Sequence, residues 1–220
     1  SVVPTSGDKA MKLDVETVSG TSEKFGICQI IESQYCSSAI GQTCTLSFKA
    51  RTTSGTVENL RAHILSWDGT ADSPTRDVVN AWNAEGSNPT FATNWTAENT
   101  ASNIAIDNTY DTYSVSGAID TAGTVNVAVF IHVDDTDLSA GNLLYITDVK
   151  LEIGSSATTF VYGGLAAGAD RYWCKRYYEK FKSGSTNDPY FAGGWKESST
   201  QALAMFYYQE KRTIPSITFS

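Results

Sequence analysis

The sequence holds few residues of the kinds that carry out acid–base or nucleophilic chemistry. Its two histidines, His63 and His132, lie outside any nucleophile or metal-binding motif, and His63 alternates with apolar residues along a predicted strand. That setting is typical of a structural histidine with satisfied polar atoms. The adjacent carboxylates Asp134 and Asp135 are of the type used in glycoside hydrolysis, but neighbouring side chains at a strand end point apart, so a solvated loop is favoured. We therefore expect a protein that is not an enzyme.

Oxygen ligands also gather in this region, which raises calcium as an alternative to a solvated loop. The residues concerned are Asp134, Asp135, Asp137 and Asn142. Their spacing lacks the regular loop of an EF-hand. Cys28 and Cys44 fall on predicted neighbouring strands, where a disulfide is conceivable, but small buried thiols are favoured for the cysteines of this chain.

Aromatic residues set among polar ones indicate a different kind of chemistry, the binding of sugars. A pyranose ring stacks its apolar face on Trp or Tyr, while Asn, Asp and Arg bond its hydroxyls. The candidates lie at a strand end, in a long polar connection, and around Gly193-Gly194, where we expect an exposed turn. These glycan-binding candidates are Trp67, Trp82, Trp95, Tyr190 and Trp195. The alternative for a tryptophan on such a loop is that it closes the end of a β-sandwich core.

Composition limits both the fold and the partners. The chain has 220 residues, of which 41% are hydrophobic and 18% charged, and this balance favours many short strands joined by turns. A net charge of -8 argues against nucleic acid as a partner, because a phosphate backbone requires a positive surface. No apolar run approaches the length needed to cross a bilayer, so we expect no membrane insertion.

Apolar residues with a period of two predict an all-β chain that begins with a jelly-roll β-sandwich over residues 1–162. Gly-containing turns separate the predicted strands, which are Ala10–Val18, Lys24–Glu32, Thr43–Arg51, Glu58–Trp67, Tyr110–Ala118, Thr124–Val133 and Leu143–Ile153. A break in the last pattern near Asp148 predicts a kink or bulge. The long polar connection Asp68–Asn108 is expected to lie over one edge of the sandwich.

A Gly/Ala-rich linker at 163–168 is expected to join the sandwich to a partial, β-rich tip domain over 169–220. Ala167–Lys175 is expected to give a turn or two of helix. Strands are then predicted near Tyr177–Lys182, Tyr190–Lys196, Ala202–Tyr208 and Ile214–Phe219. The stretch RYWCKRYYEKF at the start of this domain mixes aromatic and basic residues, as interfaces between subunits do. The interface candidates are Arg171, Tyr172, Trp173, Arg176, Tyr177 and Tyr178.

Several stretches taken together carry a resemblance to a known family. They are GDKAMKLDV, GQTCTLSFKA, LRAHILSWDGTADSPTRDVVNAWN, NPTFATNWTAENT, VNVAVFIHVDD, LLYITDVKLEIGSSATTF and RYWCKRYYEKF. The set resembles the carbohydrate-binding-module-like jelly rolls of tailed-bacteriophage tail fibres and related receptor-binding proteins. The last stretch resembles the segment that opens a small β-rich tip domain in such proteins.

The resemblance implies a structural and adhesive component of a virion, located in the tail or fibre and assembled in the host cytoplasm. The implied partners are other copies of the chain in a homotrimer, other virion tail proteins, and a host cell-surface polysaccharide. No cofactor is implied apart from a structural calcium ion at Asp148, since related jelly rolls place a calcium ligand on the last strand. The alternative for Asp148 is that it caps the kink in that strand.

Two other functions remain open. The chain could be a carbohydrate-binding module of a polysaccharide-degrading enzyme, which would be a monomer with one site for a soluble glycan. It could also be a purely structural virion protein of a collar, baseplate or head fibre. Such a protein would associate with itself without attaching to cells.

Overall fold

The computed structural model describes residues 10–18, 24–53, 57, 59–161, 172–179, 193–205, 207–212, 214 and 216. The chain divides into two compact units, Ser1–Phe160 and Val161–Ser220, which are described separately below. The expected linker at 163–168 and the candidates Arg171 and Tyr190 lie outside the described residues. The limits of the linker therefore stay a prediction.

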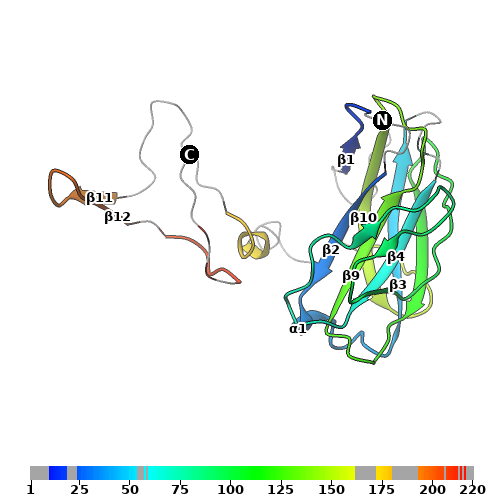
Figure 1. Ribbon diagram of the computed structural model, residues 1–220, viewed down its shortest axis with the longest axis horizontal. Helices are drawn as coiled ribbons and strands as arrows, with labels where there is room; N and C mark the ends of the chain where they lie inside the picture. The colour runs from blue at the N-terminus through cyan, green and yellow to red at the C-terminus, as the bar shows by residue number, and fades with distance from the viewer. Residues whose placement is uncertain are drawn as a thin grey trace. The chain divides into compact units, whose positions relative to one another are not determined.

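The first unit is a sandwich of two four-stranded antiparallel sheets (Figure 1). Sheet A has the strand order β1 (Met11–Asp14), β10 (Leu143–Ile153), β3 (Thr43–Thr52) and β8 (Asp111–Ala118). Sheet B has the order β2 (Phe25–Ile31), β9 (Asn126–Val133), β4 (Leu60–Trp67) and β7 (Trp95–Ala97). The unit also contains the helix α1 (Ser33–Cys36) and a small hairpin formed by β5 (Val79–Ala81) and β6 (Thr90–Phe91).

The strand pairing is that of a jelly roll, which confirms the predicted fold class. β1 pairs with β10, β2 with β9, β3 with β8, and β4 with β7, always antiparallel. Each pair is nested within the previous one along the chain, as in a long hairpin that has been rolled up into two sheets. The seven strands predicted for this part correspond to β1, β2, β3, β4, β8, β9 and β10.

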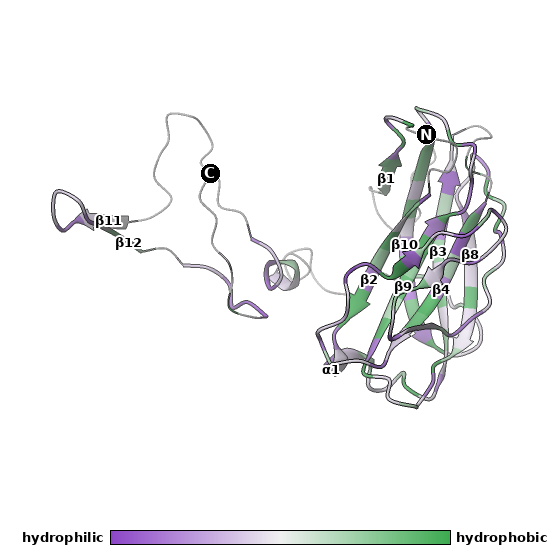
Figure 2. Cartoon of the chain, in the orientation of Figure 1, coloured by the Kyte–Doolittle hydropathy of each residue, from purple (hydrophilic) through white to green (hydrophobic). Residues whose placement is uncertain are grey.

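Sheet B is covered on both of its faces. Every residue of β4 and β9 is buried, although the sequence alternates apolar and polar residues in part of β4. The inner face packs on sheet A through side chains such as Leu60, Ile64 and Phe48, all fully buried. The strands are correspondingly hydrophobic over much of their length (Figure 2). Burial of each such side chain contributes about 1.5–3 kcal/mol to folding.

The outer face of sheet B carries a second, smaller core that the long connection 68–108 covers. Leu65 and Phe130 from the sheet pack there with Val78 and Trp95 from the connection. The expectation that this connection lies over one edge of the sandwich was therefore too narrow. It forms the edge strand β7 and also covers a sheet face, because that face presents apolar side chains that must be removed from water.

The predicted break in the last strand is confirmed as a β-bulge. The pairing of β10 with β3 shifts register between Thr147 and Lys150, and Asp148 has a φ of 53°. A left-handed backbone is uncommon for a residue with a side chain, but Asp tolerates it better than most. The bulge turns the Asp148 carboxylate toward Lys49 on β3, at 3.0 Å from its ammonium nitrogen.

A distant aspartate caps the short helix α1. The backbone N–H and the hydroxyl of Ser33 each donate to the Asp72 carboxylate at 2.8 Å. Asn126 on β9 donates its side-chain N–H to the same carboxylate and accepts from the backbone N–H of Asp72, both at 2.9 Å. These bonds fix the start of the long connection to α1 and to sheet B.

The predicted neighbourhood of Cys28 and Cys44 is wrong. Cys28 lies on β2 in sheet B and Cys44 on β3 in sheet A, so the two strands are not paired, and both thiols are free. Cys36 and Cys44 are buried as expected, whereas Cys28 and Cys174 are exposed.

In the second unit, the described residues include a helical turn at 172–175 and a hairpin of β11 (Gly193–Lys196) and β12 (Ala202–Met205). Gly193 and Gly194 belong to β11, which corrects the expectation of a turn at this point. The Glu179 carboxylate accepts from Lys175 and Lys211 at 2.8 and 3.0 Å, and so ties the helical turn to the segment 207–212. Within the described parts of both units, no helix is long and apolar enough to span a membrane.

Candidate functional site

Trp67 and Trp95 are core residues, which corrects the expectation that they could present a ring to a sugar. Each is only 5% exposed, and their ring centroids lie 5.2 Å apart. Both indole N–H groups are used within the fold, by the backbone carbonyls of Thr70 at 3.0 Å and Thr75 at 3.2 Å. The two rings close one end of the smaller core, as the alternative for loop-borne tryptophans anticipated.

Trp82 differs from them because it stays 40% exposed. It follows β5 directly and starts the loop 82–89, which we call the Trp82 loop. The inner side of its ring lies against the outer face of sheet B, with centroids 5.4 Å from His132 and 6.2 Å from Phe130. Of the predicted glycan-binding residues in the first unit, Trp82 is thus the exposed one.

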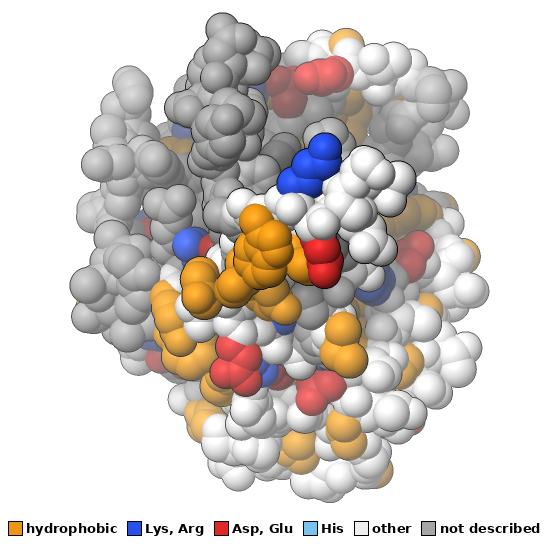
Figure 3. Space-filling model, turned by 90° about the vertical axis from the view of Figure 1, so that its left-hand side faces the viewer, with side chains coloured by type: hydrophobic (Ala, Val, Ile, Leu, Met, Phe, Trp, Pro, Cys, Tyr) orange, Lys and Arg blue, Asp and Glu red, His pale blue; other side chains and the backbone are white. Residues whose placement is uncertain are grey.

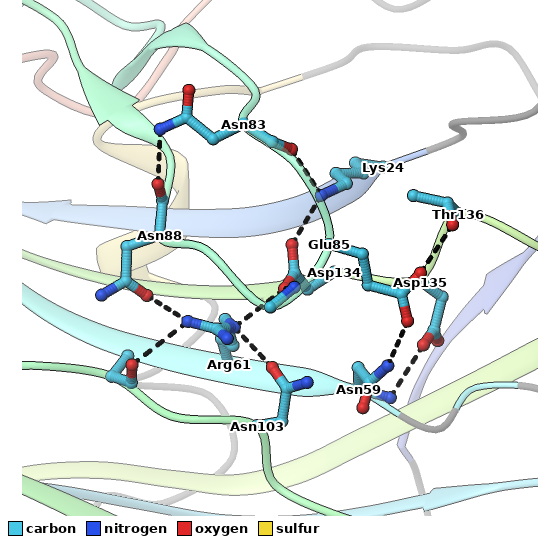
Figure 4. A network of polar contacts seen from close by, with 12 residues as sticks. Lys24, Asn59, Arg61, Asn83, Glu85, Asn88, Asn103, Asp134, Asp135 and Thr136 are labelled. Atoms are coloured by element: carbon cyan, nitrogen blue, oxygen red, sulfur yellow. Dashed lines mark hydrogen bonds and ion pairs between the residues drawn. The ribbon is translucent and has the colours of Figure 1, made fainter.

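A buried carboxylate anchors the Trp82 loop to sheet B (Figure 4). Asp134 accepts from the Lys24 ammonium at 2.6 Å, from the backbone N–H of Gly86 at 2.7 Å, and forms an ion pair with Arg61 at 3.0 Å. The side chains of Asp134, Lys24 and Arg61 are 1%, 2% and 5% exposed. We call these three charged residues the Asp134 clamp. Asp134 and Asp135 are both 1% exposed, so the expectation of a solvated loop was wrong for them.

The clamp reaches the Trp82 loop at several further points. Lys24 donates to the backbone carbonyl of Asn83 at 2.8 Å, and Arg61 donates to the Asn88 side chain at 2.5 Å. Within the loop, the Asn83 side chain donates to the carbonyl of Asn88 at 2.7 Å. Asn59, which directly precedes β4, adds a bond to Glu85 at 2.7 Å. The loop is therefore held at both ends and at its middle, which fixes the position of Trp82.

Two histidines lie beneath the loop. The rings of His63 and His132 are fully buried and stacked, with centroids 5.3 Å apart and planes 7° from parallel. None of their nitrogens has a hydrogen-bond partner among the described residues, so the expectation of a satisfied structural histidine was wrong in this respect. Burial lowers the pKa of His63 to about 3 and that of His132 to about 4. Both are neutral at pH 7, and the aromatic rings of Phe91 and Phe130 pack against them.

The calcium site expected at Asp148 gains no support from the geometry. The Lys49 ammonium at 3.0 Å already supplies the positive charge that a cation would bring to this carboxylate. Across the residues that the structure describes, no group of three or more His, Cys, Asp or Glu is arranged to hold a metal ion.

The candidates in the second unit lie on exposed surface where they are described. Trp195 is 58% exposed and lies opposite Leu203 in the hairpin. Met205, two positions from Leu203 along β12, lies on the same face. Tyr172, Trp173, Tyr177 and Tyr178 are also exposed. Figure 3 shows hydrophobic side chains gathered on one face of the space-filling view. A glycan platform at Trp195 would therefore have aliphatic neighbours, which suit a protein interface better.

Two arrangements of functional interest were not predicted from the sequence. The Asp134 clamp joins residues from three separate strand regions, and its one local signal was Arg61 within the apolar run LRAHILSW. The second arrangement is Arg51 on β3, whose guanidinium carbon lies 4.2 and 5.1 Å from the ring centroids of Tyr145 and Tyr110. No local motif marks this contact, because its three members come from different strands or loops.

No family model matches the chain, and no curated protein matches it. Among solved structures it is similar to a CBM4 protein, with 15% identity over 60% of this chain and 61% of that chain, at a TM-score of 0.35. A family 16 carbohydrate-binding module is 12% identical over 68% of this chain and 80% of that one, at a TM-score of 0.39. Tailspike protein 4 of bacteriophage CBA120 is 16% identical over 66% of this chain but only 15% of its own, at a TM-score of 0.39.

These likenesses are too weak to carry an argument about function. The chain spans less than two thirds of the CBM4 chain and a small part of the tailspike chain. The β-sandwich class itself follows from the strand order described above.

Proposed function

We propose that this protein is a non-catalytic adhesive component that binds a glycan at the Trp82 loop. The observation that supports this most strongly is the position of Trp82, half exposed and backed by the stack of His132 and Phe130. A pyranose ring stacks on such a surface through its apolar face. The polar groups beside it, including the exposed Asn83 and Glu85 side chains, supply hydrogen bonds to hydroxyls.

The rigidity of the loop supports binding. A side chain that is ordered only on contact with its ligand loses rotamer entropy, which weakens association. Here the clamp holds the loop before any ligand arrives, through Lys24, Arg61 and Asp134. The proposed platform is therefore preorganised, which is the property that a weak, repeated glycan contact requires.

We further propose that the chain is a segment of a bacteriophage tail fibre that recognises a host cell-surface polysaccharide. In this proposal it assembles in the host cytoplasm as a homotrimer beside other tail proteins, and resides in the virion. The sequence stretches that resemble tail fibres support this assignment. The second unit also supports it, because every residue there whose exposure is described is exposed or half-buried. A two-stranded hairpin such as β11–β12 is marginal by itself, so contacts with other copies would stabilise it.

The first test of this proposal is the native mass in solution, measured by light scattering on the full chain. We expect a trimer, held through the exposed aromatic residues around Tyr172 and Trp173 in the second unit. A monomer that still binds a soluble glycan would favour a carbohydrate-binding module of a polysaccharide-degrading enzyme. A trimer that binds neither glycan nor cells would favour a purely structural virion protein of a collar, baseplate or head fibre.

The glycan site itself is tested by the substitution Trp82→Ala. We expect adhesion to host cells to weaken by about 1–3 kcal/mol per site, because the stacking surface is lost while the partly exposed position tolerates the change. The measurement is whole-cell adhesion with circular dichroism as a check of folding. Tyr35→Ala is the matched control, since Tyr35 is an exposed aromatic residue of the same unit, on α1. Equal adhesion of the Trp82→Ala variant and the native protein would show that Trp82 is not part of the glycan-binding site.

A further inference from the structure

Among the described residues, the outer face of sheet A carries four cations, and three of them are neutralised on that face. Lys12 forms an ion pair with Asp14 at 2.7 Å, Lys49 with Asp148 at 3.0 Å, and Lys150 with Glu152 at 2.9 Å. Arg51 is the fourth. It shares the outward side of β3 with Lys49, because the intervening Ala50 is fully buried in the core. Among the described residues Arg51 has no carboxylate or other hydrogen-bond partner, and its Nε is buried.

Two tyrosines hold this unpaired guanidinium in place. Tyr145 lies directly opposite Arg51 in the β10–β3 ladder, and its ring centroid is 4.2 Å from the guanidinium carbon. The Tyr110 ring, at 5.1 Å, comes from the residue that precedes β8. Contacts of this kind between a cation and an aromatic face fix the plane of the guanidinium. The face therefore holds a positioned guanidinium whose N–H donors have no hydrogen-bond partner among the described residues.

The chemistry of these donors points to a carboxylate. A guanidinium offers its N–H groups in a planar fork that matches the two oxygens of one carboxylate, and a charged bond of this kind is among the stronger ones in proteins. One uncompensated positive charge also matches a monoanion better than a phosphate monoester, which carries nearly two negative charges at neutral pH.

We propose that Arg51, flanked by Tyr145 and Tyr110, is a second ligand site that binds the carboxylate of an acidic sugar. The tyrosine rings provide the apolar surface for the pyranose, and Arg51 provides the fork for its carboxylate. The site lies on sheet A, whereas the Trp82 loop covers sheet B on the other side of the sandwich. The assignment to a sugar rests on the proposed glycan function. The assignment to a carboxylate rests on Arg51 and its neighbours alone.

The test uses glycans that end in glucuronate, galacturonate or sialate, each beside its methyl ester, which keeps the ring and removes the charge. Binding is measured by calorimetry on the full chain at constant ionic strength. We expect at least one acidic glycan to bind about tenfold more tightly than its ester, and Arg51→Gln to abolish the difference. Arg51→Lys should lose most of it, because the charge remains but the planar fork does not. Circular dichroism of both variants checks that they fold.

Lys150→Gln is the matched control, since it removes the same charge from an ion pair on the same face that does not adjoin Tyr145. Its preference for the acidic form should stay within about twofold of the native value. Equal binding of acids and esters by the native protein, or an unchanged preference in Arg51→Gln, would overturn the proposal. Displacement of the glycan by inorganic phosphate but not by acetate would overturn the assignment to a carboxylate.

The outcomes also separate this proposal from the glycan function at Trp82. One outcome is that neutral glycans bind, that Trp82→Ala abolishes their binding, and that no preference for acidic glycans depends on Arg51. This outcome would support the first proposal and overturn the second. An acid preference that depends on Arg51 and survives in Trp82→Ala would support the second site independently of the first. Failure of all the glycans to bind would overturn both.

Discussion

Lowering the pH from 7 to 4 is expected to remove much of the stability of the β-sandwich through His63 and His132. Both rings are fully buried and stacked beneath the Trp82 loop, and neither has a hydrogen-bond partner among the described residues. Burial is the largest cause that holds the pKa of His63 at about 3 and that of His132 at about 4. His132 and then Arg61 lower the pKa of His63 further. At His132, the backbone at Val133 and the Asp134 carboxylate raise the pKa and oppose the lowering by burial, Arg61 and Lys24.

The direction of the effect follows from proton binding. An exposed histidine in the unfolded chain has a pKa of about 6.5, above both folded values, so the unfolded state binds more protons as the pH falls. The contribution of the neutral rings is complete above pH 6.5 and decreases toward the folded pKa values. At about 1.4 kcal/mol for each pH unit, the loss by pH 4 is on the order of 3 kcal/mol for each ring. This is a large share of the 5–15 kcal/mol that is typical of a domain.

Urea unfolding at pH 7, 5.5 and 4 measures this loss, and His63→Leu tests its source. Leucine is similar in size and does not titrate, so the variant should lose about half as much stability on acidification as the native protein. His132→Leu provides the same test for the second ring. If both variants weaken with falling pH as steeply as the native chain, protonation of carboxylates causes the loss instead.

Replacement of Asp134 by alanine is expected to destabilise the sandwich by about 3–5 kcal/mol. The change leaves the Lys24 and Arg61 side chains, which are 2% and 5% exposed, without their shared carboxylate. An uncompensated buried charge is among the most costly defects that a single substitution can introduce. The backbone N–H of Gly86 loses its acceptor in the same step, so the Trp82 loop should be released.

Glu85→Gln is the control for the clamp, because Glu85 is a carboxylate of the same network that lies on exposed surface. We expect it to change the free energy of unfolding by less than about 1 kcal/mol. Urea unfolding gives the stabilities, and the fluorescence of Trp82 reports release of the loop. A change of similar size in both variants would mean that the network acts as surface charge and not as a clamp.

The strands and the jelly-roll class were predictable because sheet A has one solvated face. A strand such as β3 therefore alternates apolar and polar residues, and the turns between strands carry Gly. The bulge at Asp148 was predictable for the same reason, since it interrupts that alternation. β5, β6 and β7 were missed because they are only two or three residues long and lie within a polar connection.

The candidate site was predicted in part, and the limit has a physical cause. Trp67, Trp82 and Trp95 have similar polar neighbours in the sequence, yet two are buried and one is exposed. Their exposure depends on which of them the connection folds against sheet B, and no local pattern encodes that choice. The Asp134 clamp likewise brings Lys24 to a residue 110 positions away, a contact that only the paired strands β2 and β9 create.

The nested strand pairing also determines the order in which the chain can fold. Met11 on β1 pairs with Ile146 on β10, so the first strand of sheet A has no partner until nearly all of the sandwich has been synthesised. The innermost pairs, β5 with β6 and then β4 with β7, have the shortest connections and can form first. Long-range pairing of this kind slows folding and exposes apolar strands in the meantime. Newly made chains should therefore depend on chaperones until β10 has emerged from the ribosome.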